Sequence, residues 1–355
     1  MKRITILVLI ITLITALTIG CSKAPEPAPE PGPVVEAPIE VSEPEPIPIP
    51  EPEVLAPEGI QSPLSGRYGA EEIVNGRIMA IVFDNHPAAR WQAGLKNAEV
   101  IYEYPVEGTF TRYIGLFLLE HPEGQIGPVR SARPYLVTKA HEFDAIFVHV
   151  GGSEAAKADA RNLKVAEIDG LTSSPKVFWR EGSKKAPNNL YTSMDVLRQV
   201  QNDKGFRSKS EYEGFKFIGD EDTRTGDLAN IVDIIYNKSN SSRFEYDQES
   251  ENYKRFKDNK PHIDESDGSQ LIADNIIIQK TNIKVLDNEG RLGIAVEGEG
   301  NGIYISRGFS EEITWKKSSR SGKTYYMDNS GNEIFLKPGT TWIQVIGSNS
   351  SVNIE

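Results

Sequence analysis

Cysteine and histidine are scarce in this sequence, and their scarcity excludes several kinds of site. Cys21 is the only cysteine among 355 residues, which leaves no intramolecular disulfide and no site built from several thiolates. The five histidines are scattered and form no His-Glu-x-x-His pair. Neither a Gly-x-x-x-x-Gly-Lys-Ser/Thr loop nor a dinucleotide fingerprint occurs. We therefore predict no metal and no cofactor.

The sequence also has no excess of positive charge. The formal net charge is -12, and no stripe of lysine and arginine with interleaved aromatic residues occurs. Because nucleic-acid binding depends on positive charge, this composition argues against nucleic acid as a partner. Residues 22–58 contain nine glutamates and one lysine, so the rest of the chain is only mildly acidic.

The first twenty residues have the pattern of a secretory signal peptide. Residues 1–3 carry the positive charge, and residues 4–19 form an uncharged apolar run that is short for a membrane span. Gly20 precedes Cys21, which resembles the bacterial lipobox, where the cysteine is diacylated. We expect acyl chains such as palmitate at Cys21 and attachment to the outer face of the bacterial plasma membrane. The alternative is an uncleaved N-terminal membrane helix.

Residues 21–60 are predicted to hold the anchor and a spacer. Proline, glutamate and small apolar residues alternate through most of this segment. Such a composition cannot bury a core and favours an extended polyproline II conformation. The segment would hold a folded part away from the lipid surface.

Residues 61–205 are predicted to form an α/β domain with a mixed sheet. Helical spacing occurs at 154–162 and 193–202, and strand-length apolar runs occur at 78–83, 100–106, 111–119 and 144–150. The strand at 111–119 is apolar on both faces, so it should be central. Ser131 is expected to cap a helix that has Pro134 in its first turn. Strands that alternate with helices are typical of α/β domains.

The sequence after residue 205 has a different composition and pattern. Residues 206–230 are charged and punctuated by glycine, which is typical of a connector. Residues 231–350 contain many short strands separated by turns, with a hairpin turn at 328–332. The sequence therefore predicts an α+β or α/β protein whose C-terminal domain is mainly β.

Three arginines flank the strand at 111–119: Arg112 near its start, and Arg130 and Arg133 at the next helix entry. A helix N-terminus and arginine side chains both suit a carboxylate or phosphate. Other polar residues follow the strand ends, where ligands gather in open α/β sheets. The predicted ligand-binding set is Arg112, Arg130, Arg133, Arg180, Asp84, Asn85, Glu103, Glu107, His149, Asn189 and Tyr191.

Two alternatives stay open for these residues. The carboxylates of the set would neutralise the arginines in buried ion pairs. In an envelope hydrolase or transferase, Glu107 or Asp84 would instead act as general acid or base with His149 as its partner. Carboxylates held bidentately by arginine would favour binding or scaffolding, whereas open access to Glu107 and His149 would favour chemistry.

Several sequence blocks resemble the YerB-type lipoprotein family of Gram-positive bacteria. The blocks begin at Asp84 (DNHP), Glu107 (EGTFTR), Gly127 (GPVRSAR), His149 (HVGGS), Asn189 (NLYT) and Gly339 (GTTWI). The resemblance covers about residues 64–346, and the block at 127–133 is its most specific part. This chain departs from the family pattern at Trp91, where proline is usual, and at Asn188, where histidine is common. The second departure argues against acid-base chemistry by a histidine at position 188.

The resemblance implies lipid anchoring and two domains, and it implies no particular activity. Together with the arginines, it leads us to expect a membrane-anchored extracytoplasmic protein that binds or scaffolds without catalysis. The expected partner is an anionic envelope component, such as a peptidoglycan stem-peptide carboxylate or a teichoic acid phosphate, or an envelope protein. Enzymatic activity stays undecided.

Overall fold

The computed structural model describes residues 58–119, 122–219 and 226–355. The predicted signal peptide, the lipidation site Cys21 and most of the spacer lie outside these ranges. All described elements belong to one unit of the chain, Leu55–Glu355. Within the described ranges, no helix has both the length and the apolar character that a membrane crossing requires.

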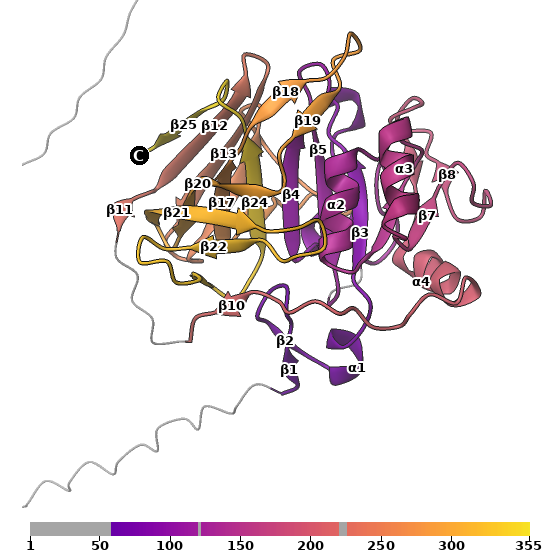
Figure 1. Ribbon diagram of the computed structural model, residues 1–355, viewed down its shortest axis with the longest axis horizontal. Helices are drawn as coiled ribbons and strands as arrows, with labels where there is room; N and C mark the ends of the chain where they lie inside the picture. The colour runs from indigo at the N-terminus through magenta and orange to yellow at the C-terminus, as the bar shows by residue number, and fades with distance from the viewer. Residues whose placement is uncertain (1–57, 120–121, 220–225) are drawn as a thin grey trace, which may run out of the picture. The chain divides into compact units, whose positions relative to one another are not determined.

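An eleven-stranded mixed sheet runs through the described chain (Figure 1). Its order is β11-β21-β20-β17-β24-β4-β5-β3-β6-β7, and β22 pairs with β21. The strands are β3 (Met79–Asp84), β4 (Val100–Pro105), β5 (Thr111–Phe117), β6 (Ile146–His149), β7 (Glu167–Asp169), β11 (Asp227–Leu228), β17 (Asn275–Lys280), β20 (Gly298–Ser306), β21 (Phe309–Lys317), β22 (Tyr325–Met327) and β24 (Thr341–Ile346).

A second, six-stranded antiparallel sheet covers part of one face of the large sheet. It consists of β12 (Ile231–Asn237), β13 (Asn240–Asp247), β14 (Asn252–Lys257), β15 (Lys260–Pro261), β16 (Ile272–Ala273) and β25 (Ser351–Ile354). Val232 and Phe244 of this sheet share a core with Ile276 and Trp342 of the large sheet. Burial of apolar side chains on both inner faces holds the two sheets together.

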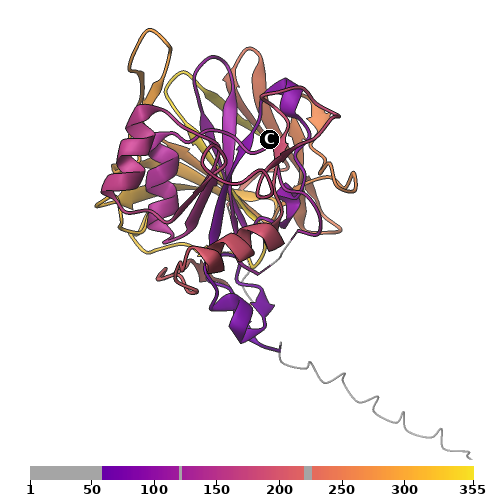
Figure 2. The same cartoon turned by 90° about the vertical axis from the view of Figure 1, so that its right-hand side faces the viewer.

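The helices lie on both faces of the large sheet (Figure 2). On one face, α2 (Pro134–Glu142) and α3 (Glu154–Asn162) pack through alanines and through Leu136 against Val82. On the other face, which the second sheet covers in part, α4 (Met194–Asp203) contributes Met194 and Leu197 to the core. The short helical elements are α1 (Glu71–Val74), η1 (Pro87–Ala89) and η2 (Leu95–Asn97). The short strand pairs are β1 (Ile60–Gln61) with β2 (Tyr68–Gly69), β8 (Trp179–Arg180) with β9 (Leu190–Tyr191), β10 (Lys216–Phe217) with β23 (Phe335–Leu336), and β18 (Ile283–Val285) with β19 (Leu292–Ile294).

The fold class and the central position of β5 are confirmed. Every residue of β5 is buried, and the strand lies between β4 and β3. The predicted helix at 154–162 coincides with α3. The prediction for Ser131 was wrong, because Arg133 is the N-cap residue of α2 and Pro134 occupies the first helical position. Ser131 instead lies in the extended segment that leads to the helix.

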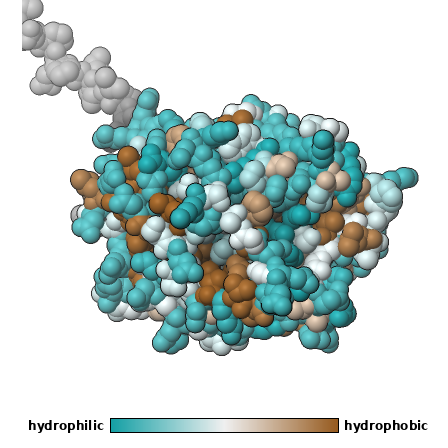
Figure 3. Space-filling model, turned by 90° about the horizontal axis from the view of Figure 1, so that it is seen from above, coloured by the Kyte–Doolittle hydropathy of each residue, from teal (hydrophilic) through white to brown (hydrophobic). Residues whose placement is uncertain are grey.

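The large sheet crosses the boundary between the two predicted domains. Strand β24 of the C-terminal part pairs in parallel with β4 of the N-terminal part, in a register that places Thr341 beside Val100 and Ile343 beside Tyr102. Strand β10, in the predicted connector, pairs with β23. Seen from above, the surface is mostly hydrophilic with scattered hydrophobic patches (Figure 3).

Candidate functional site

The candidate site lies where β3 ends, beside the start of α2. Strand β6 accompanies β3 only as far as Ile81. Beyond that point the segment 127–133 takes its place: the Arg130 amide donates to the Val82 carbonyl at 2.9 Å, and the Asp84 amide donates to the Pro128 carbonyl at 2.8 Å. These two hydrogen bonds hold the segment beside β3. They fix Arg130 next to Asp84.

Glu107 holds two of the three predicted arginines. Arg133 donates to both of its carboxylate oxygens, with Nε 3.0 Å from Oε2 and Nη2 bonded to Oε1. Arg112 approaches the same carboxylate with Nη2 3.4 Å from Oε1, and its Nη1 donates to the Ser131 carbonyl at 3.0 Å. We call this cluster of Glu107, Arg112 and Arg133 the clasp. It joins the loop after β4, strand β5 and the segment that enters α2.

The charges in this clasp shift the pKa values of its members. Burial raises the pKa of Glu107, but the hydrogen bonds from Arg133 and the charges of Arg112 and Arg133 outweigh it, so the pKa is lowered. Burial, with the nearby charge of Arg133, lowers the pKa of Arg112 to about 10. At neutral pH the group is thus a carboxylate between two guanidinium ions. The group carries one net positive charge.

Arg130 is the least engaged of the three arginines. Its Nε lies 3.3 Å from Asp84 Oδ2, and the other contact to this oxygen is a 2.7 Å hydrogen bond from Asn188 Nδ2. Its Nε is buried and makes no hydrogen bond among the described residues, while 27% of the side chain is exposed. A partly exposed charged side chain therefore lies beside the clasp.

The predicted residues Glu103 and Asn85 lie on the opposite face of the sheet. Alternation along β4 and β5 pairs Tyr104 with Arg112 on the α2 side, and pairs Glu103 with Tyr113 on the side of the second sheet. Glu103 is fully buried there, and Asn85 joins it through Thr111. These two residues belong to the contact between the sheets.

His149 is enclosed rather than open. It is 2% exposed, its Nδ1 lies 2.8 Å from the Gly151 carbonyl oxygen, and its Nε2 lies 3.1 Å from Glu167 Oε2. The carbonyl of Gly151 also accepts from the Ala132 amide. The ring therefore supports the backbone next to the arginine segment.

The remaining predicted residues lie on β8, on β9 and in the loop between them. Arg180 donates to Asn189 Oδ1 at 2.7 Å, so these two side chains satisfy each other. The hydroxyl of Tyr191 donates to Glu265 Oε2 at 2.6 Å. Asn188, which was not in the predicted set, is the residue of this loop that reaches Asp84. The signal in the sequence that could have identified Asn188 is its departure from the family pattern, in which histidine is common at this position.

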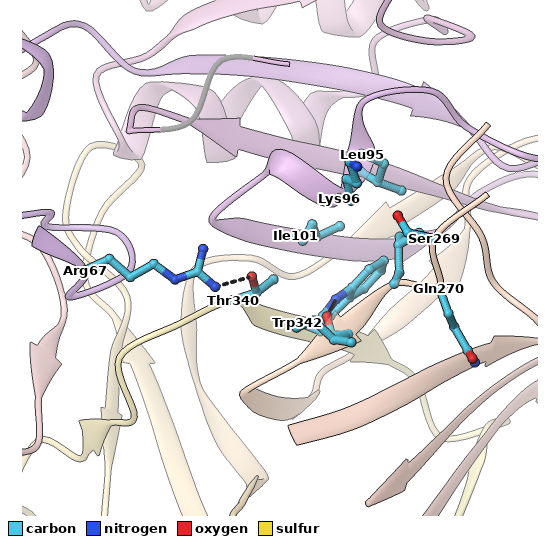
Figure 4. Close-up of a pocket in the computed structure, with 10 residues that line it drawn as sticks. Arg67, Leu95, Lys96, Ile101, Ser269, Gln270, Thr340 and Trp342 are labelled. Carbon is cyan, nitrogen blue, oxygen red and sulfur yellow. Dashed lines mark hydrogen bonds between the residues drawn. The ribbon is translucent and has the colours of Figure 1, made fainter. Parts of the chain in front are cut away.

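A separate cavity of about 270 Å³ is lined by residues of β4, β24 and η2 and by residues 269–272 (Figure 4). Trp342, Ile101 and Leu95 form apolar parts of its wall, and Arg67 donates to Thr340 Oγ1 at 3.4 Å on one side. Its lining shares no residue with the predicted set. The charged groups at its edge, Arg67 and Lys96, pair with Asp274 and Asp267.

The fold and this site define a two-domain α+β protein with a mixed sheet and an arginine cluster at one strand end. The chain belongs to the family described as "Protein of unknown function (DUF3048)": residues 64–207 match its N-terminal domain and residues 232–343 match its C-terminal domain.

One relative is "Putative lipoprotein YerB" of Bacillus subtilis (strain 168). It is 32% identical over 289 residues, which are 81% of this chain and 86% of the relative. The crystal structure of the YerB protein from Bacillus subtilis superposes with a TM-score of 0.75 at 31% identity, and the match covers 83% of this chain and 99% of that one. The similarity therefore extends over both parts of the fold.

Proposed function

We propose that this protein is a lipid-anchored lipoprotein on the outer face of the bacterial plasma membrane that binds an anionic cell-envelope component without catalysis. The name of the Bacillus subtilis relative supports lipid anchoring. The apolar run that ends at Gly20-Cys21 supports acylation at Cys21. The proline-rich spacer would let the folded part reach into the wall.

The observation that carries the binding proposal is the state of Arg130, whose Nε makes no hydrogen bond among the described residues and whose side chain is 27% exposed. Arg112 and Arg133 lie beside it, and the three arginines outnumber Asp84 and Glu107 by one charge. A carboxylate of a peptidoglycan stem peptide or a phosphate of teichoic acid would supply that charge and accept hydrogen bonds from the Arg130 guanidinium.

The same contacts favour binding over a hydrolase or transferase. Glu107 is held bidentately by Arg133, and its lowered pKa keeps it ionised at neutral pH, which does not suit a general acid. Asp84 accepts from Asn188 and pairs with Arg130. His149 is enclosed by Gly151 and Glu167.

A binding titration tests this proposal. The match to the crystallised relative supports the folding of a fragment that starts at residue 58. This fragment would be titrated with muropeptides that carry free stem carboxylates, with the same muropeptides amidated, and with poly(glycerol phosphate). Arg130→Ala should weaken binding of the preferred probe about ten- to a hundredfold, as expected for a charged hydrogen bond.

Arg291→Ala is the matched control, since Arg291 is exposed and, in the part of the chain that the structure describes, pairs with Asp287 and Glu289 of its own turn. It should bind as the wild type does. Equal affinities of the wild type and Arg130→Ala for all three probes would refute the proposed site. A preference for the free over the amidated muropeptide assigns a carboxylate ligand, and a preference for the polymer assigns a phosphate.

A further inference from the structure

A lysine, an asparagine and a glutamate meet in the buried space between the two sheets. Asn240 lies on β13 and Lys257 on the neighbouring strand β14, where Lys257 is in register with Ser242. Glu103 reaches them from β4 of the large sheet. Asn240 is 2% exposed, and the other two residues are fully buried.

The amine of Lys257 contacts both partners. Its Nζ lies 2.5 Å from Asn240 Oδ1 and 2.8 Å from Glu103 Oε1. Asn240 Nδ2 donates to the carbonyl of Thr109 at 2.9 Å, which turns the carbonyl oxygen of its amide toward the lysine. The amine is therefore held against the carbonyl group of an amide, with a carboxylate at its other side.

This environment favours a nucleophilic amine. Burial outweighs the opposing charge of Glu103 and lowers the pKa of Lys257 to about 8, so a fraction of the amine is neutral near physiological pH. A desolvated lysine of this kind is a nucleophile. Three groups held in contact also lose little entropy on reaching the reacting geometry.

We propose that Lys257 and Asn240 join through an intramolecular isopeptide bond, with Glu103 as the carboxylate that positions the amine. A bond forms between Lys257 Nζ and Asn240 Cγ, and the bond between Cγ and Nδ2 breaks. One proton passes from the attacking nitrogen to Nδ2, which leaves as ammonia. Glu103 itself stays ionised, because burial raises its pKa but the charges of Lys257 and Arg255 outweigh burial and lower it to about 2. The step consumes no oxidant and no second reactant.

A second buried cluster shows why the asparagine matters. Lys139 and Lys317 both contact Glu142 in the core beneath α2, and among the described residues no side-chain amide bonds to either amine. That cluster has the composition of an ion-pair network and no amide to attack. The cluster at Lys257 adds the electrophile.

Intact-mass spectrometry of the fragment from residue 58 tests the proposal. The wild type should be lighter than its sequence mass by one ammonia. After trypsin digestion, the peptide 239–243, which contains Asn240, should remain attached to the peptide that begins at Phe256, because the amide at Lys257 prevents cleavage there. A succinimide at another asparagine also loses ammonia, but it leaves the two peptides separate.

Substitutions separate the three roles. Lys257→Arg keeps the positive charge and removes the nucleophile, Asn240→Ala removes the electrophile, and both should have the full sequence mass. Glu103→Gln should retain ammonia in part or completely. Lys260→Arg, on the exposed strand β15, is the matched control and should be cross-linked as the wild type is.

The wild-type measurement decides the matter even if a substitution prevents folding. A folded wild type with its full sequence mass would overturn the proposal and leave an ion-pair network between the sheets. Loss of ammonia without joined peptides would overturn it as well. Loss of ammonia in Asn240→Ala would do the same.

Discussion

Replacing Glu142 by glutamine should destabilise the protein strongly, because this one carboxylate holds two buried ammonium groups. Its Oε2 lies 2.8 Å from Lys139 Nζ and 2.9 Å from Lys317 Nζ, and Oε1 accepts from the Thr324 amide at 2.8 Å. Helix α2 carries Glu142 and Lys139, whereas Lys317 and Thr324 come from the C-terminal part. The cluster therefore ties the two parts together.

The expected magnitude follows from what the substitution leaves behind. Removing one partner of a buried ion pair costs about 3–5 kcal/mol, because the other charge stays buried without compensation. Glutamine keeps the volume and can still accept from the Thr324 amide. Burial already lowers the pKa of Lys139, so this amine can shed its proton when the carboxylate is lost. Both effects place the expected loss near the lower limit, at about 3 kcal/mol.

Urea unfolding of the fragment from residue 58, followed by tryptophan fluorescence, measures this loss. Glu154→Gln is the matched control, since Glu154 forms an exposed pair with Lys157 on α3. It should change the free energy of unfolding by no more than about 0.5 kcal/mol. A loss below about 1 kcal/mol for Glu142→Gln would show that the buried charges are not coupled as the structure has them.

Two further predictions concern acid and the arginine segment. Burial raises the pKa of Glu142, but the two lysines lower it below its ordinary 4.5. Its contribution to the free energy of unfolding is therefore present above pH 4.5 and disappears as the pH falls further. The difference in stability between the wild type and Glu142→Gln should shrink in acid, and a constant difference would contradict this. Gly127→Ala should lower the free energy of unfolding by about 1–3 kcal/mol in thermal melts, because a Cβ would lie 2.9 Å from the Leu190 carbonyl oxygen at φ +150°. Gly182→Ala is the control and should change it little, because a Cβ at Gly182 would meet open space.

Local patterns predicted the elements well. The helix α3 begins after Ser153, whose hydroxyl accepts from the Ala156 amide, and its buried alanines follow a helical period. The runs that became β3 and β5 are apolar at successive positions, and such strands are buried on both faces. The spacing of apolar residues is local in sequence, which is why these elements could be predicted from it.

The joining of both parts in one sheet could not be read in the same way. Strand β24 pairs with β4 although Thr341 and Val100 are far apart in the chain, and such a pairing depends on the register of the whole sheet. The sequence of β24 also gave no clear sign of its central position. All of β24 is buried, but Thr341 and Gln344 interrupt its apolar residues.

The arginine site shows where neighbouring positions mislead. Asp84 and Asn85 are adjacent, and the sequence placed both in one crevice together with Glu103. A strand directs successive side chains to opposite faces, so Asp84 meets Arg130 whereas Asn85 and Glu103 enter the space between the sheets. The face of the sheet that carries Glu103 could not be assigned from the sequence, because its partners belong to the second sheet. The charges that pair with Glu103 come from Arg255 and Lys257, which lie more than a hundred residues later in the chain. What the sequence suggested as one anion site is therefore two polar clusters, one open beside Arg130 and one sealed around Glu103.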